Sequence, residues 1–286
     1  MDPMLALGVA VIAVSTSAIL IRAGDAPKPV MAFYRVLFTT LLLAPLAGRY
    51  LEDFRRLDNR DVLAAGAAGI ALAAHFAAWF ESVDRTSIAA SVTLVQTAPV
   101  FVAIGARTLL DERLTRSMIA GILLAAGGSA VMSAGGIFGG TGPAPLLGNA
   151  LAVVGAIMAA GYVLAGRSIR QRVRLVPYVL VVYAVCTVVL FGYVLATGFA
   201  FGGYPRHEWL LFLGMAVGPG LFGHTVVNWA LEHLESSVVS VTLVGEPVGS
   251  TILALAIFGE VPTVATVLGG AIVLSGIVVT AQGRRT

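Results

Sequence analysis

Charged residues and cysteine are both scarce in this sequence. Asp, Glu, Lys and Arg together make up 12% of its 286 residues, against about 25% in a typical soluble domain. Hydrophobic residues make up 58%, so a soluble protein of this composition could not cover its surface with polar groups. The composition therefore predicts a membrane protein, in which lipid replaces water around most of the surface.

The sequence also lacks features that several other classes of protein need. Its one cysteine, Cys186, lies in an apolar run, which excludes an internal disulfide and a cysteine-based metal site. There is no Walker loop, no G-x-S-x-G and no HExxH motif, so we expect neither ATP hydrolysis nor a metal or cofactor. No Lys or Arg precedes the first apolar stretch, 4–21, which is expected to be a retained span rather than a cleaved signal.

Long apolar windows recur along the whole chain. A helix needs about 20 largely apolar residues to cross the hydrocarbon core of a bilayer. The sequence therefore predicts an all-α membrane protein with ten transmembrane helices. The ten windows are 4–21, 29–48, 61–80, 87–107, 117–134, 147–166, 175–197, 208–230, 237–258 and 263–281.

The basic residues predict the orientation of these helices. With a cytoplasmic N-terminus, thirteen arginines fall in inside segments, among them Arg284 and Arg285, and only four basic residues fall in outside segments. The positive-inside rule then places both termini in the cytoplasm. The basic excess is thus a topology signal and does not indicate a nucleic-acid partner.

The two halves of the chain resemble each other. SVTLV occurs at 91–95 and at 240–244, and each copy is followed by a proline. Each half holds an odd number of spans, so the second half must enter the membrane in the opposite sense. This pattern predicts two inverted-topology five-helix repeats, 1–135 and 147–286, joined by a Gly/Pro-rich loop at 136–146, around a central cavity. The matched positions are His75 with His224, Pro99 with Pro247, Glu112 with Glu260, Thr115 with Thr263, Gly121 with Gly269 and Gly128 with Gly276.

Several segments resemble one known family. PVFVAIGARTLLDE at 99–112 and EPVGSTILALAIFGE at 246–260 resemble the helix-four and helix-nine segments of EamA domains, in the drug/metabolite transporter superfamily. FYRVLFTTLLLAP at 33–45 resembles the second helix of that family, and 224–248 is most similar to its YddG-type amino-acid exporters. The resemblance covers essentially the whole chain.

The resemblance implies a secondary exporter of small metabolites, most of all amino acids, either aromatic or of broad range. It also implies alternating access of the two halves and a multi-pass location in the inner (plasma) membrane. Ser15, Thr16 and Ser17 stand where the family usually has a more aromatic residue, which leaves the shape of the pocket open.

Other functions remain open at this point. The cargo could instead be nucleobases, sugars or cationic drugs. A rival of a different class is an intramembrane enzyme acting on lipid, with His75 or His224 paired in space with a serine. The sequence leaves open whether transport is coupled to protons or is facilitated diffusion. It also leaves open whether the protein is a monomer or a homodimer, and which side the cavity faces at rest.

Ionisable groups inside a membrane are costly, so each needs a reason. Glu246 lies near the middle of its span, where it could titrate a proton, anchor a substrate ammonium group or make a structural hydrogen bond. Arg35 could attract a carboxylate, pair with Glu246 or extend toward the headgroups, and the structural alternatives are favoured for it.

Polar and aromatic residues within the spans are the further candidates for substrate binding. His75 with Trp79, and His224 with Asn228, are spaced i and i+4, so each pair shares a helix face. The remaining candidates are Gln96, Tyr162 and Trp229, for which ordinary packing or an interfacial aromatic belt is the alternative.

Prolines within the spans predict bending points. Pro99 and Pro247 occupy matching places in the two halves, and Pro219 interrupts a third span. Because proline removes a backbone hydrogen bond, we expect these three positions to act as hinges.

Overall fold

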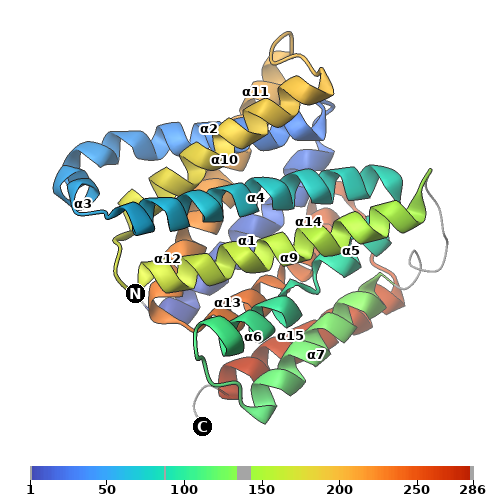
Figure 1. The fold of residues 1–286 in the computed structure, drawn as a ribbon. Coiled ribbons are helices and arrows are strands. Elements are labelled where there is room, and N and C mark those ends of the chain that lie inside the picture. The colour runs from blue at the N-terminus through green and yellow to red at the C-terminus, as the bar shows by residue number, and fades with distance from the viewer. Residues whose placement is uncertain (1, 87, 134–142, 284–286) are drawn as a thin grey trace.

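The computed structural model describes residues 2–86, 88–133 and 143–283. Throughout these ranges the regular secondary structure is helical, with no strand, and the helices form one elongated bundle (Figure 1). Most of the predicted 136–146 loop lies outside the described residues, as do Arg284 and Arg285.

Nine helices in the described ranges are long and apolar enough to cross a membrane, and α7 is a shorter apolar helix of 17 residues. The predicted window 117–134 corresponds to α7, and its last residue, 134, lies outside the described residues. The all-α membrane fold is thus confirmed. In chain order the elements are α1 (Pro3–Arg22), α2 (Lys28–Leu43) continued by η1 (Ala44–Tyr50) and α3 (Leu51–Arg55), α4 (Asn59–Arg85), α5 (Ile88–Val95), α6 (Ala98–Leu109), α7 (Arg116–Met132), α9 (Pro145–Arg170), α10 (Leu175–Thr197), α11 (Arg206–Met215), η2 (Ala216–Thr225), α12 (Val226–His233), α13 (Ser236–Leu243), α14 (Glu246–Phe258) and α15 (Val264–Gly283).

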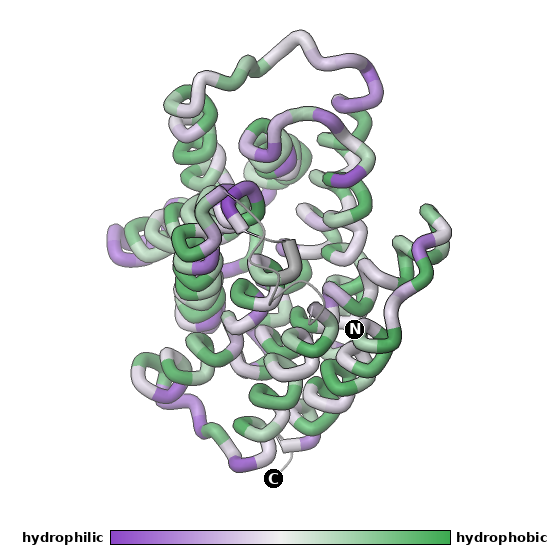
Figure 2. The backbone as a smooth tube through the Cα atoms, turned by 90° about the vertical axis from the view of Figure 1, so that its right-hand side faces the viewer, coloured by the Kyte–Doolittle hydropathy of each residue, from purple (hydrophilic) through white to green (hydrophobic). Residues whose placement is uncertain are grey.

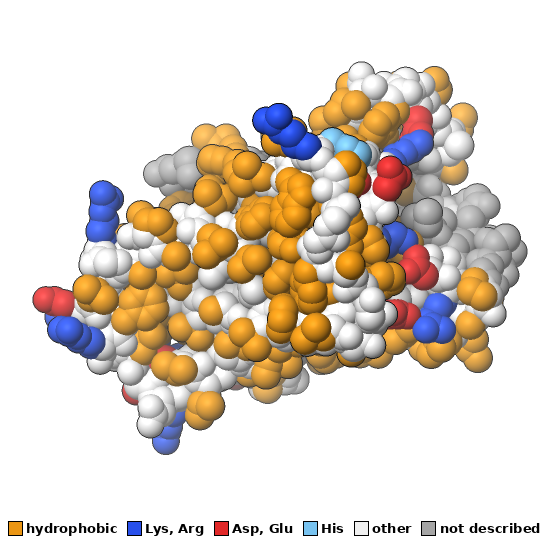
Figure 3. Space-filling view, turned by 90° about the horizontal axis from the view of Figure 1, so that it is seen from above, with side chains coloured by type: hydrophobic (Ala, Val, Ile, Leu, Met, Phe, Trp, Pro, Cys, Tyr) orange, Lys and Arg blue, Asp and Glu red, His pale blue; other side chains and the backbone are white. Residues whose placement is uncertain are grey.

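The outside of the bundle is largely apolar. Hydropathy mapped on the backbone shows hydrophobic segments along the helices and hydrophilic ones mainly at their ends and connections (Figure 2). In the space-filling view, hydrophobic side chains predominate over the middle of the visible face, and charged side chains gather toward its two ends (Figure 3). Many large apolar side chains, Leu63 and Leu109 among them, are exposed at the surface. Such a surface is suited to lipid rather than to water.

Two helices from opposite halves pack at backbone distance. A Cβ atom on Gly128 of α7 would lie 2.8 Å from the carbonyl oxygen of Gly269 in α15. A Cβ atom on Gly121 would lie 2.6 Å from the carbonyl oxygen of Gly276. Because position 121 meets 276 while 128 meets 269, α7 and α15 run antiparallel. Small residues at such contacts allow membrane helices to approach closely.

Three spans are interrupted near their middle. α5 ends at Val95 and α6 begins at Ala98, with Pro99 in its first turn. α13 ends at Leu243 and α14 begins at Glu246, with Pro247 in its first turn. Since proline is favoured in the first turn of a helix, both prolines start a new segment rather than bending a continuous one.

The third interruption is a change of helix type. Pro219 lies inside η2, which is a ten-residue π-helix between α11 and α12. Neighbouring hydroxyl groups meet carbonyl oxygens in this segment: Thr39 Oγ1 lies 3.1 Å from the oxygen of Ala216, and Thr225 Oγ1 lies 3.2 Å from that of Gly220. π-Helical turns are frequent at functional sites.

Candidate substrate-binding cavity

A cavity of ≈ 350 Å³ lies between the helices near the interrupted spans. Its wall is formed by α1, α2, α4, α5, α6, α9, η2, α12, α13 and α14. Nine of the candidate binding, coupling and hinge residues predicted from sequence line it: Arg35, His75, Trp79, Gln96, Pro99, Tyr162, His224, Glu246 and Pro247.

Arg35 brings a buried cation to this cavity. Its side chain comes from α2. Nη1 of Arg35 donates a hydrogen bond of 3.0 Å to Ser17 Oγ, and the guanidinium lies over the ring of Phe76 at 5.1 Å from the centroid. The predicted alternative of an ion pair with Glu246 is not formed among the described residues. The guanidinium thus keeps donors for a further acceptor.

Glu246 brings the opposite charge from the first turn of α14. Its carboxylate faces the cavity and makes no hydrogen bond or ion pair with any described residue. The backbone oxygen of Glu246 accepts a hydrogen bond of 3.2 Å from Ser15 Oγ, which fixes the start of α14 against α1. A basic and an acidic group therefore face one cavity without a direct ion pair between them.

Aromatic rings form a second part of the wall. The rings of His75 and Trp79 stack with an interplanar angle of 9° and centroids 6.4 Å apart. His224 lies between Phe76 and Tyr162, with centroid distances of 6.0 and 6.2 Å. Nδ1 of His75 lies 2.9 Å from the carbonyl oxygen of Gly155, which holds the ring in place. Nε1 of Trp79 is buried without a hydrogen-bond partner among the described residues.

Asn228 lies behind the wall rather than in it. Its Nδ2 donates to Tyr162 Oη at 2.5 Å and to the carbonyl oxygen of His224 at 2.8 Å. The amide thereby sets the position of the Tyr162 hydroxyl. The expected shared face of His224 and Asn228 is present, but Asn228 supports the lining instead of contacting the cavity.

One residue predicted to bind substrate lies elsewhere. Trp229 does not line the cavity and packs on His233, with centroids 4.3 Å apart. Pro219, which was predicted as a hinge and not as a lining residue, lies in η2. Conversely, sequence reasoning missed Phe76 as a lining residue, although it is spaced i and i+3 with Trp79.

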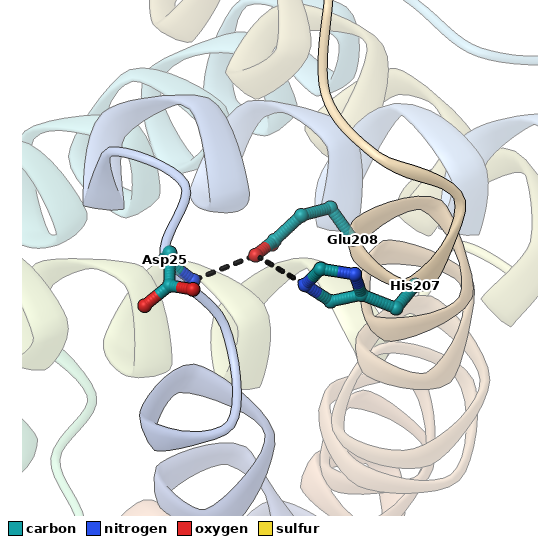
Figure 4. Close-up of side chains that lie close together, drawn as sticks. All are labelled: Asp25, His207 and Glu208. Atoms are coloured by element: carbon teal, nitrogen blue, oxygen red, sulfur yellow. Dashed lines mark hydrogen bonds and ion pairs between the residues drawn. The ribbon is translucent and has the colours of Figure 1, made fainter.

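A separate polar cluster ties two helix ends together outside the cavity. Glu208, at the start of α11, accepts a hydrogen bond of 2.6 Å from the backbone N–H of Asp25. The same carboxylate oxygen lies 3.3 Å from Nε2 of His207 (Figure 4). The bond links the α1–α2 connection to α11 and so braces this end of the bundle.

An apolar helical bundle around a partly polar cavity is the architecture of a small-molecule membrane transporter. The model of the EamA-like transporter family matches this chain twice, over residues 3–134 and 146–282. The chain belongs to this family, within the drug/metabolite transporter superfamily, and is a non-enzymatic transporter. The intramembrane enzyme considered as a rival is thereby set aside.

Similar proteins agree with this assignment. An uncharacterized transporter of Bacillus subtilis, YxxF, is 25% identical over 276 residues, which cover 91% of this chain and 83% of the relative. An uncharacterized transporter of Archaeoglobus fulgidus is 28% identical over 228 residues and covers 79% of each chain. A protein of known crystal structure, 22% identical, matches 99% of this chain and 98% of its own with a TM-score of 0.80, which supports the fold.

Proposed function

We propose that this transporter exports small zwitterionic metabolites, amino acids in the first place, by alternating access of two inverted halves. One observation carries the proposal: Arg35 and Glu246 face the same cavity and form no ion pair with each other. An amino acid presents a carboxylate and an ammonium group a few bonds apart. It therefore complements both charges at once.

The chemistry of each group fits its proposed partner. A guanidinium can bind a carboxylate through two parallel hydrogen bonds, which are stronger than bonds between neutral groups. The Glu246 carboxylate complements the ammonium group. The stacked pair His75 and Trp79 offers a flat surface to an apolar or aromatic side chain. Gln96, which lies just before α6, supplies an uncharged polar group on the same wall.

The packing supports two inverted halves. A two-fold axis requires that each contact between the halves has an equivalent with the partners exchanged. The glycines meet this requirement: Gly121 matches Gly269 in the repeat, and their contact partners, Gly276 and Gly128, match each other. The interruptions before Pro99 and Pro247 also match. We propose 1–135 and 147–286 as these halves, joined by 136–146.

The direction of transport and the membrane rest on sequence. Resemblance of 224–248 to amino-acid exporters supports export, and the arginine distribution supports cytoplasmic termini in an inner (plasma) membrane. Glu246, an ionisable group facing the cavity, is the proposed site of proton coupling. Hinge motion at Pro99, Pro219 and Pro247 would move the halves against each other.

Reconstituted protein tests this proposal. Proteoliposomes are preloaded with a mixture of labelled amino acids, and efflux is followed with and without a pH gradient. The expected result is efflux of several amino acids that is lost in Glu246→Ala and retained in Glu52→Gln, a change on the exposed Glu52–Arg56 pair. A gradient effect that disappears in Glu246→Gln would support proton coupling. Efflux of nucleobases or cationic dyes, without amino acids, would favour those cargoes.

A further inference from the structure

Two ion pairs occupy corresponding places at opposite ends of the bundle. Arg167 pairs with Glu112 at 2.9 Å, and Arg22 pairs with Glu260. We propose that these pairs are the two gates of the transport cycle, of which one must break for the cavity to open at its end. This inference rests on the proposed alternating access and names the residues that perform it.

The two glutamates are equivalent in sequence and in backbone geometry. Each follows a residue with positive φ at the end of a helix: Asp111 has a φ of 52° and Gly259 a φ of 69°. The N–H of Glu112 donates to the carbonyl oxygen of Ala106 at 3.0 Å. The N–H of Glu260 donates to the carbonyl oxygen of Ala254 at 3.4 Å. Asp111 is the only residue other than glycine with positive φ in the described ranges, so the shared turn is unusual.

The two arginines are equivalent as well. α1 and α9 each place three residues on the cavity wall. One fixed offset in residue number aligns the three residues of α1 with the three of α9. The same offset, continued along both helices, aligns Arg22 with Arg167. Hence each gate joins the first helix of one proposed half to the end of the fourth helix of the other. The aligned cavity residues are Val14 with Ala159, Ser17 with Tyr162, and Ala18 with Val163.

The gates lie at opposite ends of the bundle. α4 has 27 residues and so spans about 40 Å at ~1.5 Å per residue. Its first turn pairs with the segment that directly follows α9, through Asp61 and Arg172 at 2.7 Å. Its last turn pairs with the start of α2 through Asp84 and Lys28 at 2.6 Å. Arg167 therefore lies near one end of α4, and Arg22 near the other.

The two gates differ in this conformation. The side chains of Arg167 and Glu112 are 20% and 8% exposed, whereas those of Arg22 and Glu260 are 56% and 43% exposed. Glu112 also accepts hydrogen bonds from the N–H and the hydroxyl of Ser236, at 3.2 and 2.8 Å. Arg167 donates to the carbonyl oxygen of Leu231 at 2.9 Å. The Arg167–Glu112 gate is thus braced by two further segments.

This difference predicts which gate is closed at rest. A partly buried, multiply bonded pair holds its segments together more strongly than a pair in water. The end at Arg167 is therefore sealed in this conformation, and the end at Arg22 is ready to open. If the Arg22–Glu260 pair gained such bracing contacts while the Arg167–Glu112 pair lost them, the protein would convert to its opposite-facing form.

Accessibility of the cavity tests the gates without any transported substrate. A single cysteine is introduced by Ser250→Cys, on the cavity wall, in a Cys186→Ala background. A membrane-impermeant thiol reagent is then added to either side of vesicles in which the protein has one orientation. In otherwise unmodified protein, labelling is expected to be faster from the Arg22 side, because the exposed Arg22–Glu260 pair breaks more readily than the braced Arg167–Glu112 pair.

The variants separate the gates from the proposed cargo. Glu112→Gln should raise labelling from the Arg167 side about tenfold, and reversal of the pair by Glu112→Arg with Arg167→Glu should restore the original sidedness. Glu260→Gln should raise no labelling from the Arg167 side, and Glu52→Gln is the control for charge loss. Unchanged sidedness in folded Glu112→Gln would overturn the gate proposal. Absent amino-acid efflux with altered sidedness would overturn only the cargo.

Discussion

Asn228 and Tyr162 are joined by a hydrogen bond of 2.5 Å that ties α12 to α9 directly behind the cavity wall. Asn228 is fully buried, and its Nδ2 also bonds the carbonyl oxygen of His224. One amide thus fixes two residues of the lining. We infer that Asn228 shapes the cavity although it does not line it.

Removal of this bond is expected to weaken the fold and the cavity together. Asn228→Ala should lower the free energy of unfolding by roughly 0.6–2 kcal/mol, the range for polar contacts between membrane helices. Tyr162→Phe should lower it less, because the ring is kept. Thermal unfolding of both single variants and the double variant measures the coupling. Additive effects in this cycle would contradict a direct bond between the two side chains.

Arg35 is expected to determine affinity for the substrate carboxylate. Charged hydrogen bonds contribute about 1.5–3 kcal/mol, so Arg35→Gln should raise KM for amino-acid efflux roughly ten- to hundredfold. Arg35→Lys should be intermediate, because an ammonium keeps the charge and loses the paired donors. Arg49→Gln, at an exposed arginine outside the cavity, is the matched control. Equal KM values for Arg35→Gln and the control would rule out this role.

Trp79 is expected to set preference among side chains. Contacts between aromatic rings contribute about 0.5–1.5 kcal/mol, so Trp79→Ala should reduce efflux of aromatic amino acids about two- to tenfold relative to alanine. Phe199→Ala, an exposed aromatic residue away from the lining, should leave the ratio unchanged. Competition between labelled phenylalanine and alanine measures it. An unchanged ratio in Trp79→Ala would show that the ring does not contact the substrate side chain.

The contact between α7 and α15 predicts a sharp difference between adjacent glycines. A Cβ atom on Gly128 would lie 2.7 Å from the backbone nitrogen of Val273, whereas Gly127 has no atom within 4 Å of its Cβ position. Gly128→Ala should therefore destabilise the protein by roughly 1–3 kcal/mol, as overpacking does elsewhere. Gly127→Ala should be neutral or slightly stabilising. Thermal stability in detergent, compared between the two variants, checks this, and equal stabilities would contradict the packing.

Much of the helical framework could be predicted because apolar length and proline positions act locally. The windows predicted the spans, and the matched prolines predicted both interruptions near the cavity. The matched histidines predicted two lining residues, His75 and His224, because a repeat transfers a position from one half to the other.

What sequence missed depends on rotation and on contacts between distant segments. Trp229 lies five residues after His224, so it is turned about 140° away from the cavity face in a regular helix. Arg35 reaches the wall because Ser17 and Phe76 hold it there, which is a tertiary effect. Pro219 predicts a break but not the ten-residue π-helix around it, whose geometry depends on neighbours such as Thr39.

The central claim is that one cavity binds the two charges of a zwitterion through Arg35 and Glu246. The most direct measurement compares three competitors of labelled amino-acid efflux from proteoliposomes: phenylalanine, its decarboxylated amine and its deaminated acid. The account predicts that phenylalanine competes at least about tenfold better than either single-charge analogue, since each analogue loses one charged contact worth ~1.5 kcal/mol or more. It also predicts that Arg35→Gln removes the advantage over the amine, and that Glu246→Gln removes the advantage over the acid. Equal competition by all three in the wild-type protein would contradict the zwitterion site.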